Sequence, residues 1–366
     1  MGVLNSTGSF FVPAVAAAVS NLAYILFIVA TMKDLTIWNL SAAVLIGGAC
    51  HMILQWYWCG RMGLVLTPSM PKRKNEELKS MMYLFFPYAA GLSLNQVNPV
   101  ISRMFGSFLT GGSISVLTYA DRVLQLPLGL FVIAISQAVL PMLSRQDPED
   151  RAGFRDFIRD ALRFDLFVIL PVSVGLFALS QETVHILFFR GAFTEWAWHA
   201  TGTVLAIYGL GLPGMASSTV ILRAMYARRM PRGAVGVTGV TVTVNLVACT
   251  LLMPAFKYAG LAGATALAFT CSSFYGAWGL SRDLSEPLGV FGLKWTAKIF
   301  FSTALMFLAL NILKMLLPYP LSASVLMRAG WLAAMIFAGV ALYSLSTILL
   351  RCSEWGWIKD ALKKKK

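Results

Sequence analysis

The sequence predicts an all-α membrane protein with about ten transmembrane helices. Hydrophobic residues make up 58% of the 366 residues and charged residues only 13%, whereas roughly 25% of the residues in soluble domains are charged. Ten apolar stretches approach the roughly 20 residues that a helix needs to cross about 30 Å of hydrocarbon. These stretches lie at 10–31, 40–58, 80–102, 115–143, 164–181, 202–222, 234–253, 260–280, 299–317 and 328–350.

Basic residues are distributed unevenly between the two sides of these spans. With both chain ends placed in the cytoplasm, 23 of the 30 Lys and Arg residues fall in cytoplasmic connections or tails and five fall outside. The positive-inside rule predicts this orientation, because the opposite one would invert the bias. The net charge of +14 therefore reflects membrane topology and does not indicate nucleic-acid binding.

The first two spans lie within residues 1–62, and a basic cytoplasmic linker follows at 63–79. No Lys or Arg precedes Lys33, so the first span by itself would tend to insert in the opposite orientation. We therefore expect earlier spans upstream and interpret the sequence as a truncated chain.

Between the fourth and fifth spans, residues 147–163 are too polar to cross a membrane but have helical periodicity. Arginines recur every four residues on one face, at Arg151, Arg155, Arg159 and Arg163. Apolar side chains occupy another face, at Phe154, Phe157, Ile158, Ala161 and Leu162. This pattern predicts an amphipathic helix on the inner membrane surface, with its arginines near anionic lipid head groups. An ordinary solvated connector is the alternative.

The fourth span contains two adjacent charged residues, Asp121 and Arg122, about 10 Å below its outer end at 1.5 Å per residue. An Arg at this depth costs from about 3 to more than 10 kcal/mol, so it should face a partner or a watery cavity. Neighbouring residues on a helix do not face each other, and a guanidinium can hold two phosphate oxygens at once. The functional interpretation is an Arg122 that binds a phosphate or diphosphate. The alternative is an Arg122 that pairs with Asp121 and reaches the outer interface.

A second polar strip lies in the third span, where Arg103 follows Asn95, Gln96 and Asn98. These residues predict either a lining of the same cavity or a hydrogen-bond network between helices.

The sequence offers no sign of enzymatic chemistry. The five cysteines have no CxxC spacing, and the three histidines have no partner at i+3 or i+4 that would make a metal site. Gly209, Gly211 and Gly214 match GxGxxG but lie inside an apolar span with no preceding strand. Small residues at Gly260 and Ala264 instead indicate close helix packing. We expect a transporter without cofactor or metal.

The motifs resemble the MurJ (MviN) family of lipid II flippases, within the superfamily that includes multidrug and polysaccharide exporters. The resemblance is carried by residues 119–122 (YADR), 126–129 (LPLG) and 140–145 (LPMLSR), supported by 190–194 (RGAFT) and 226–228 (YAR). It implies fourteen spans in two six-helix lobes around a cationic cavity, followed by two helices that form a groove for a polyprenyl tail.

On that plan, residues 1–62 would be two helices from the end of the first lobe. Residues 80–281 would be the whole second lobe, and residues 282–366 would be the two tail-groove helices with a basic C-terminal tail. The resemblance also implies localisation in the bacterial cytoplasmic (inner) membrane, with the cell-wall synthesis machinery as a further expected partner.

The resemblance implies that Arg122 contacts the diphosphate of an undecaprenyl-linked peptidoglycan precursor. Asp121, Arg103, Asn98 and Tyr119 are the other expected substrate-binding residues. The family's coupling-ion position is in doubt, because Cys249 stands where some members have a carboxylate. A different polysaccharide-lipid flippase, a drug exporter of the same superfamily and an inactive fragment remain as alternatives.

Overall fold

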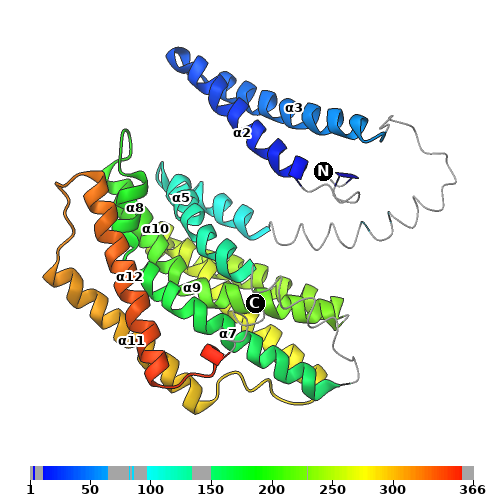
Figure 1. The fold of residues 1–366 in the computed structure, drawn as a ribbon, viewed down its shortest axis with the longest axis vertical. Helices are drawn as coiled ribbons and strands as arrows, with labels where there is room; N and C mark the ends of the chain where they lie inside the picture. The colour runs from blue at the N-terminus through cyan, green and yellow to red at the C-terminus, as the bar shows by residue number, and fades with distance from the viewer. Residues whose placement is uncertain are drawn as a thin grey trace. The chain divides into compact units, whose positions relative to one another are not determined.

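The computed structural model describes residues 3–4, 11–64, 82, 85, 97–133, 150–228 and 230–356. The chain divides into two compact units, unit 1 (Met1–Tyr83) and unit 2 (Leu84–Lys366). Every regular element in the described residues is a helix (Figure 1). The predicted all-α fold class is therefore confirmed for the described part of the chain.

The described part of unit 1 contains two long helices, α2 (Phe11–Ala30) and α3 (Ile37–Arg61), joined by the short helix η1 (Met32–Asp34). The two long helices pack against each other. A Cβ at Gly47 would lie 2.9 Å from the carbonyl oxygen of Ser20, so only glycine allows the backbones to approach this closely. Many other side chains of the pair are exposed and apolar, as expected of helices that face lipid.

Unit 2 contains the other described helices. They are α5 (Ser113–Pro127), the π-helix η2 (Leu128–Ile133), α7 (Arg151–Ala178), α8 (Ser180–Phe188), α9 (Glu195–Ala227), α10 (Pro231–Leu284), α11 (Leu293–Leu316) and α12 (Val325–Leu349). Residues 97–106 form a further helical segment before α5. The central helix is α9, which packs against α5, α7, α8 and α10.

Polar side chains fix where three of these helices begin. The side chains of Asp150, Thr194 and Ser324 accept hydrogen bonds from backbone N–H groups in the first turns of α7, α9 and α12. Such N-caps satisfy donors that the helix itself leaves unpaired. In contrast, α5 begins after Gly112, which has a φ of 94° and supplies no side-chain cap.

The long helix α10 is two helices joined at Lys257, whose φ of 51° and ψ of −129° are not helical. A Cβ at Gly276 would lie 3.0 Å from the Val237 side chain, and a Cβ at Gly260 would clash with the Leu252 carbonyl group. The two halves therefore run back along each other. The two spans predicted on either side of residues 254–259 are confirmed as separate helices.

Seven helices within the described ranges are long and apolar enough to cross a membrane, and one of these, α10, consists of two consecutive helices. The third predicted span, at 80–102, and the end of the fourth, at 115–143, lie partly outside the described residues. The count of ten spans therefore stays a prediction at those two positions.

The predicted surface helix at 147–163 is wrong as a separate element. Its described residues are continuous with the following span in the single helix α7. Its apolar face is also buried inside the protein, because Phe154, Ile158 and Leu162 join a cluster with residues of α9 and α10. The amphipathic pattern was real, but its apolar face packs on neighbouring helices and does not enter lipid.

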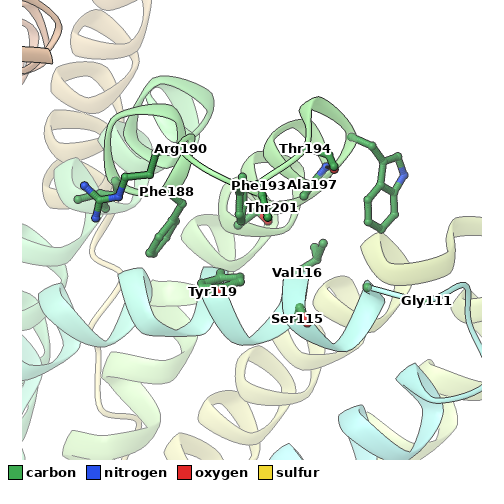
Figure 2. Close-up of a pocket in the computed structure, with 14 residues that line it drawn as sticks. Gly111, Ser115, Val116, Tyr119, Phe188, Arg190, Phe193, Thr194, Ala197 and Thr201 are labelled. Atoms are coloured by element: carbon green, nitrogen blue, oxygen red, sulfur yellow. Dashed lines mark hydrogen bonds between the residues drawn. The ribbon is translucent and has the colours of Figure 1, made fainter. Parts of the chain in front are cut away.

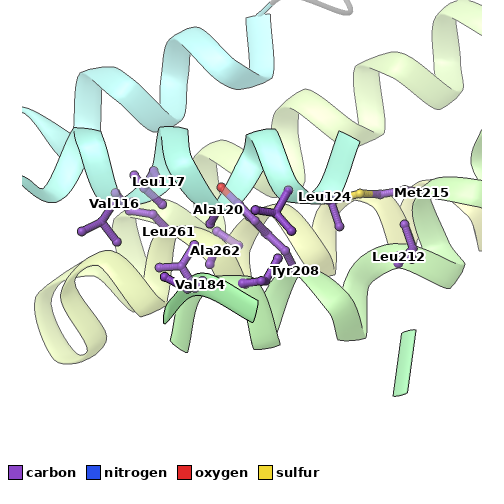
Figure 3. Packing of buried hydrophobic residues seen from close by; sticks show 14 of the residues in the cluster. Val116, Leu117, Ala120, Leu124, Val184, Tyr208, Leu212, Met215, Leu261 and Ala262 are labelled. Atoms are coloured by element: carbon purple, nitrogen blue, oxygen red, sulfur yellow. The ribbon is translucent and has the colours of Figure 1, made fainter. Parts of the chain in front are cut away.

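The largest core cluster lies where α5 crosses α9 and the second half of α10. Figure 3 shows Val116, Ala120 and Leu124 of α5 beside Tyr208 and Leu212 of α9. These α5 residues are 2% exposed or less. Because they recur every four positions, they form one face of the helix. The opposite face of α5 does not pack in this core.

The glycine motif in α9 has a packing role. A Cβ at Gly211 would lie 2.6 Å from the Cβ of Ala266, and one at Gly214 would lie 2.8 Å from the backbone nitrogen of Thr270. Both glycines therefore let α9 approach the second half of α10 closely. This contact agrees with the interpretation that GxGxxG does not bind a nucleotide here.

Candidate functional site

The unpacked face of α5 carries the charged pair predicted from the sequence. Arg122 is exposed, and it makes no ion pair with any described residue. The Asp121 carboxylate instead accepts a hydrogen bond from the side-chain nitrogen of Gln125, 2.7 Å away. The two neighbours therefore do not neutralise each other, and the alternative in which Arg122 pairs with Asp121 is not observed.

A pocket of about 230 Å³ lies beside this face, between the 97–106 segment, α5, α9 and the second half of α10. Its charged lining residues are Arg103 and Asp121, and its uncharged polar residues include Asn98, Gln125 and Thr265. Three of the five predicted substrate-binding residues, Asn98, Arg103 and Asp121, are thus brought together. Arg122 does not line this pocket.

A buried chain of polar side chains starts at Asn98, which lines the pocket. The side-chain nitrogen of Asn245 donates to the side-chain oxygen of Asn98 at 3.1 Å, and the Cys249 thiol donates to the Asn245 oxygen at 3.0 Å. All three residues are buried, and none of them carries a charge. The chain joins the 97–106 segment to α10 as an interhelical hydrogen-bond network, which was one of the two predicted roles for this polar strip. Asn95 and Gln96 lie outside the described residues.

Tyr119 lines a different pocket, of about 610 Å³, near the start of α5. Figure 2 shows it beside Phe188 and Phe193, and the ring centroids lie 4.9 and 5.5 Å from that of Tyr119. The predicted site residues are therefore divided between two pockets. Arg122 lines neither of them.

Three buried acids in unit 2, Asp165, Glu182 and Glu354, were missed by the sequence analysis. Asp165 of α7 is 0% exposed, and both carboxylate oxygens lack a hydrogen-bond partner among the described residues. Its position was readable, because it continues the buried series Phe154, Ile158 and Leu162 of α7 at helical spacing. Glu182 of α8 is 8% exposed.

Glu182 belongs to a polar junction that ties α8 to the α11–α12 pair. Its carboxylate lies 2.7 Å from the Lys314 ammonium. Nearby, His185 Nδ1 lies 2.9 Å from the Tyr319 hydroxyl and 3.3 Å from an Arg328 nitrogen. Because the guanidinium can only donate, Nδ1 must accept, and the ring is neutral. Burial and the Arg328 charge both lower the pKa of His185 below its ordinary value of 6.5.

An apolar pocket of about 450 Å³ lies between α7, α11 and α12. Its lining is dominated by aliphatic and aromatic side chains, including Pro171, Met306, Leu310, Met335 and Tyr343. This composition is suited to a hydrocarbon chain. Within the described residues, no three His, Cys, Asp or Glu side chains gather as a metal site.

Comparisons with known proteins identify the family that this sequence matches. The family model of the lipid II flippase MurJ matches residues 1–328. The chain is 29% identical to the probable lipid II flippase MurJ of Rhizobium tropici, over all of this chain and 70% of that protein. It is also 29% identical to the corresponding protein of Rhizobium meliloti, over 93% of this chain and 65% of that protein.

A solved structure, the lipid II flippase MurJ in an inward closed conformation, superposes with a TM-score of 0.76 at 25% identity. The superposition covers 95% of this chain and 69% of that one. The chain thus spans about two thirds of the length of the relatives that it matches.

Proposed function

We propose that this chain, which belongs to the lipid II flippase MurJ family, moves a lipid-linked peptidoglycan precursor from the inner to the outer leaflet of the bacterial cytoplasmic membrane. Such transport makes and breaks no covalent bond. The protein must therefore supply a polar site for the charged head group, an apolar surface for the tail, and a change of access between the two leaflets.

The observation that carries the proposal is the exposed guanidinium of Arg122 on α5, which belongs to the predicted fourth span. Charged side chains within membrane helices are costly and mark substrate pathways when they lack a structural partner. Arg122 makes no ion pair in the described part of the chain, and the opposite face of α5 packs in the core. An anionic diphosphate would complete its hydrogen bonding, and two phosphate oxygens can bind one guanidinium.

We assign Arg103, Asp121 and Asn98 to the same substrate pathway, as a mixed-charge lining next to Arg122. Arg103 adds a second exposed cation without an ion pair among the described residues. Asp121, held by Gln125, adds an acceptor for hydroxyl or amide groups of the head group. Tyr119, one helical turn before Arg122, extends this face towards the start of α5.

We further propose that the apolar pocket between α7, α11 and α12 holds the polyprenyl tail. Burial of hydrocarbon in such a pocket is favourable by about 25 cal/mol per Å² removed from water, but the gain over lipid is small. The pocket would therefore position the tail and add little affinity. Residues of the region 282–366, which was predicted to form a tail groove, line about half of this pocket, and residues of α7 line most of the rest.

We propose that both ends of the chain lie in the cytoplasm, with Arg151, Arg228 and Arg282 on that side. The support is the asymmetric distribution of basic residues along the sequence. Cysteine substitutions at positions 151 and 190, probed with a membrane-impermeant thiol reagent in intact cells, test this orientation. Labelling is expected at position 190 only.

The central experiment measures transport of fluorescent lipid II by the purified chain in vesicles. We expect Arg122→Ala to lower the transport rate at least about tenfold, because one charge-assisted bidentate contact is lost. Arg122→Lys should retain part of the activity. Arg151→Ala, which changes another exposed arginine, is the matched control and should transport normally.

Transport by Arg122→Ala at the normal rate would reject the assigned role of this residue. No transport by the unsubstituted chain, in vesicles where it is folded, would reject the proposal that this chain acts as a flippase by itself.

A further inference from the structure

The polar junction of α8 lies at one end of the apolar pocket between α7, α11 and α12. The lining of that pocket follows α7 from Phe167 to Leu179 and continues into α8 at Thr183. Glu182 directly precedes Thr183 in the sequence, and His185 follows it two positions later. Because α7 begins on the proposed cytoplasmic side, this end of the pocket faces the outer side of the membrane.

The junction attaches the α11–α12 pair to α8 through side-chain contacts. The Glu182 carboxylate lies 2.7 Å from the Lys314 ammonium of α11. His185 Nδ1 lies 2.9 Å from the hydroxyl of Tyr319, in the loop between α11 and α12, and 3.3 Å from a nitrogen of Arg328 in α12. These contacts fix how closely the pair packs on α8 at the outer end of the pocket.

The cytoplasmic end of the pair is attached to α7 by a different kind of contact. The Tyr343 hydroxyl of α12 donates to the Phe167 carbonyl oxygen at 2.8 Å, and Trp355 packs on Phe167 with ring centroids 6.0 Å apart. Neither contact involves a group that changes charge between pH 5 and 8, since tyrosine titrates near pH 10. Acidification in that range should therefore leave both contacts intact.

His185 is the junction residue whose side chain can change charge in that range. Its Nδ1 accepts a hydrogen bond from Arg328, because a guanidinium can only donate. A proton on Nδ1 would remove this acceptor and place a second positive charge 3.3 Å from the Arg328 nitrogen. Burial and the Arg328 charge accordingly lower the pKa of His185 below its ordinary value of 6.5.

The other side chains packed around the His185 ring do not balance this added charge. Phe189 and Trp198 have ring centroids 4.7 and 4.6 Å away, and both are uncharged. Glu182, one turn earlier on α8, is already paired with Lys314. The protonated ring could still donate to the tyrosine of the junction, but that hydroxyl is neutral.

The ring lies just below the protein surface. His185 is 3% exposed, but Phe189, which stacks on it, is 37% exposed, so a small movement lets a proton reach the ring. His199, which stacks on the other histidine neighbour Trp198, is exposed and lies 3.9 Å from the Glu195 carboxylate. Acidification can therefore charge both histidines, but His199 faces an acid and His185 faces an arginine.

We propose that His185 makes the attachment of the α11–α12 pair to α8 sensitive to the pH on the outer side. A proton bound at Nδ1 separates Arg328 and the loop at Tyr319 from α8, and the outer end of the apolar pocket opens. The use of this opening, to release a hydrocarbon tail, rests on the proposed tail-binding role of the pocket. The opening itself does not, because no ligand takes part in it.

Hydrogen exchange of the full chain in nanodiscs, without any lipid-linked substrate, measures the opening. Between pH 7.5 and 5.5, after correction for the intrinsic pH dependence of exchange, the first two turns of α12 (residues 325–332) should lose about fivefold in protection. This is the scale of one partly exposed charge interaction. Residues 340–349, at the cytoplasmic end of α12, should keep their protection.

Two substitutions remove the pH response in different ways. His185→Gln keeps a neutral acceptor for Arg328 and should abolish the response. Arg328→Gln removes the second cation and should also abolish it, while the pKa of His185 rises towards 6.5. Because the chain has three histidines, NMR of the protein labelled with ¹⁵N-histidine can follow this titration. His199→Gln is the matched control and should respond like the unsubstituted chain.

Several results would overturn the proposal. These are equal protection of residues 325–332 at the two pH values, a response that persists in His185→Gln, and an equal loss at residues 340–349. If His185→Gln does not fold, Arg328→Gln applies the same test. Arg122→Ala separates this proposal from the transport proposal, because it should lower transport and keep the pH response.

Discussion

Two groups of arginines in unit 2 differ in the partners of their guanidinium groups. At the end where α7 begins, Arg155 pairs with Asp156 and Glu286, Arg159 pairs with Asp156 and Asp160, and Arg228 pairs with Asp283. Arg163 donates instead to the backbone carbonyls of Gly289 and Val290, both at 2.9 Å. These cations connect α7 and α9 to the end of α10 and the loop after it.

The second group, Arg103, Arg122 and Arg190, makes no ion pair within the described part of the chain. These side chains belong to the 97–106 segment, α5 and the loop after α8, and two of them line pockets. The comparison shows that an arginine's environment decides its role. Arginines with internal acids connect helices, whereas Arg103 and Arg122 are the ones that we propose to bind an anionic ligand.

The largest expected effect is the loss of lipid II transport when Arg103 is substituted. Arg103→Ala should lower lipid II transport in vesicles at least about tenfold, since the pocket would keep Asp121 but lose its cation. The melting temperature should stay within about 1 °C, because no internal pair is lost. Arg103→Lys is the control that keeps the charge.

A melting temperature that falls markedly in Arg103→Ala would place Arg103 in the structural group and break the comparison.

Arg228 should show the opposite pattern. Its side chain is 12% exposed, lies 2.7 Å from the Asp283 carboxylate and stacks over Phe154 at 5.1 Å. Arg228→Ala should lower the free energy of unfolding by about 2 kcal/mol, because Asp283 loses its partner. Unfolding of the purified protein in denaturant measures this change.

The control for Arg228 is Arg151→Ala, at the exposed start of α7, where the change should stay within about 0.5 kcal/mol. Equal effects of the two substitutions would show that the ion pair adds nothing to stability.

Asp165 is an acid without an arginine partner in the described part of the chain, so its substitution tests whether an unpaired buried carboxyl group lowers stability. It is buried in α7 without a hydrogen-bond partner among the described residues, so Asp165→Leu should raise the free energy of unfolding by about 1 kcal/mol. Asp165→Asn keeps two polar atoms in the same place and should give none of this gain. A large loss of stability in Asp165→Leu would mean that the carboxyl group makes an interaction in the membrane-embedded protein.

The smallest expected effect concerns His185 at the α8 junction. Its pKa is lowered from 6.5, so the folded protein binds fewer protons than the unfolded chain near that pH. The stability from the neutral ring is therefore present above pH 6.5 and is lost as the pH falls through the lowered pKa. We expect a small drop in melting temperature between pH 7.5 and 5 that is absent in His185→Gln. A rise in melting temperature on acidification would contradict this sign.

Hydropathy predicted the helices well because it depends only on the residues within each stretch of about 20 positions. A stretch of about 20 apolar residues can satisfy its backbone in a membrane only as a helix, whatever surrounds it. This reasoning found the break near Lys257 inside α10, and it gave the fold class from composition. It failed at the start of α7, because a buried apolar stripe and a lipid-facing one have the same periodicity.

The candidate site was predictable only in part. Arg122, Asp121 and Arg103 stood out because charged residues are rare within a span. Asn98 stood out because it belongs to a polar strip within an apolar stretch.

The sequence did not show that Tyr119 lines a different pocket. The burial of Asp165 follows from its helical spacing to Phe154, Ile158 and Leu162, but the sequence analysis missed it.

The sequence by itself determined that the chain is a helical membrane protein with cations inside its spans. Only the tertiary structure decided which cations have partners, because Asp283 lies 55 positions from Arg228 and Glu286 is still further from Arg155. These pairs form when α7, α9 and α10 pack closely, which Gly211 and Gly214 permit. Close packing brings distant side chains within a few ångströms, and short-range interactions between such residues are not encoded in any local pattern.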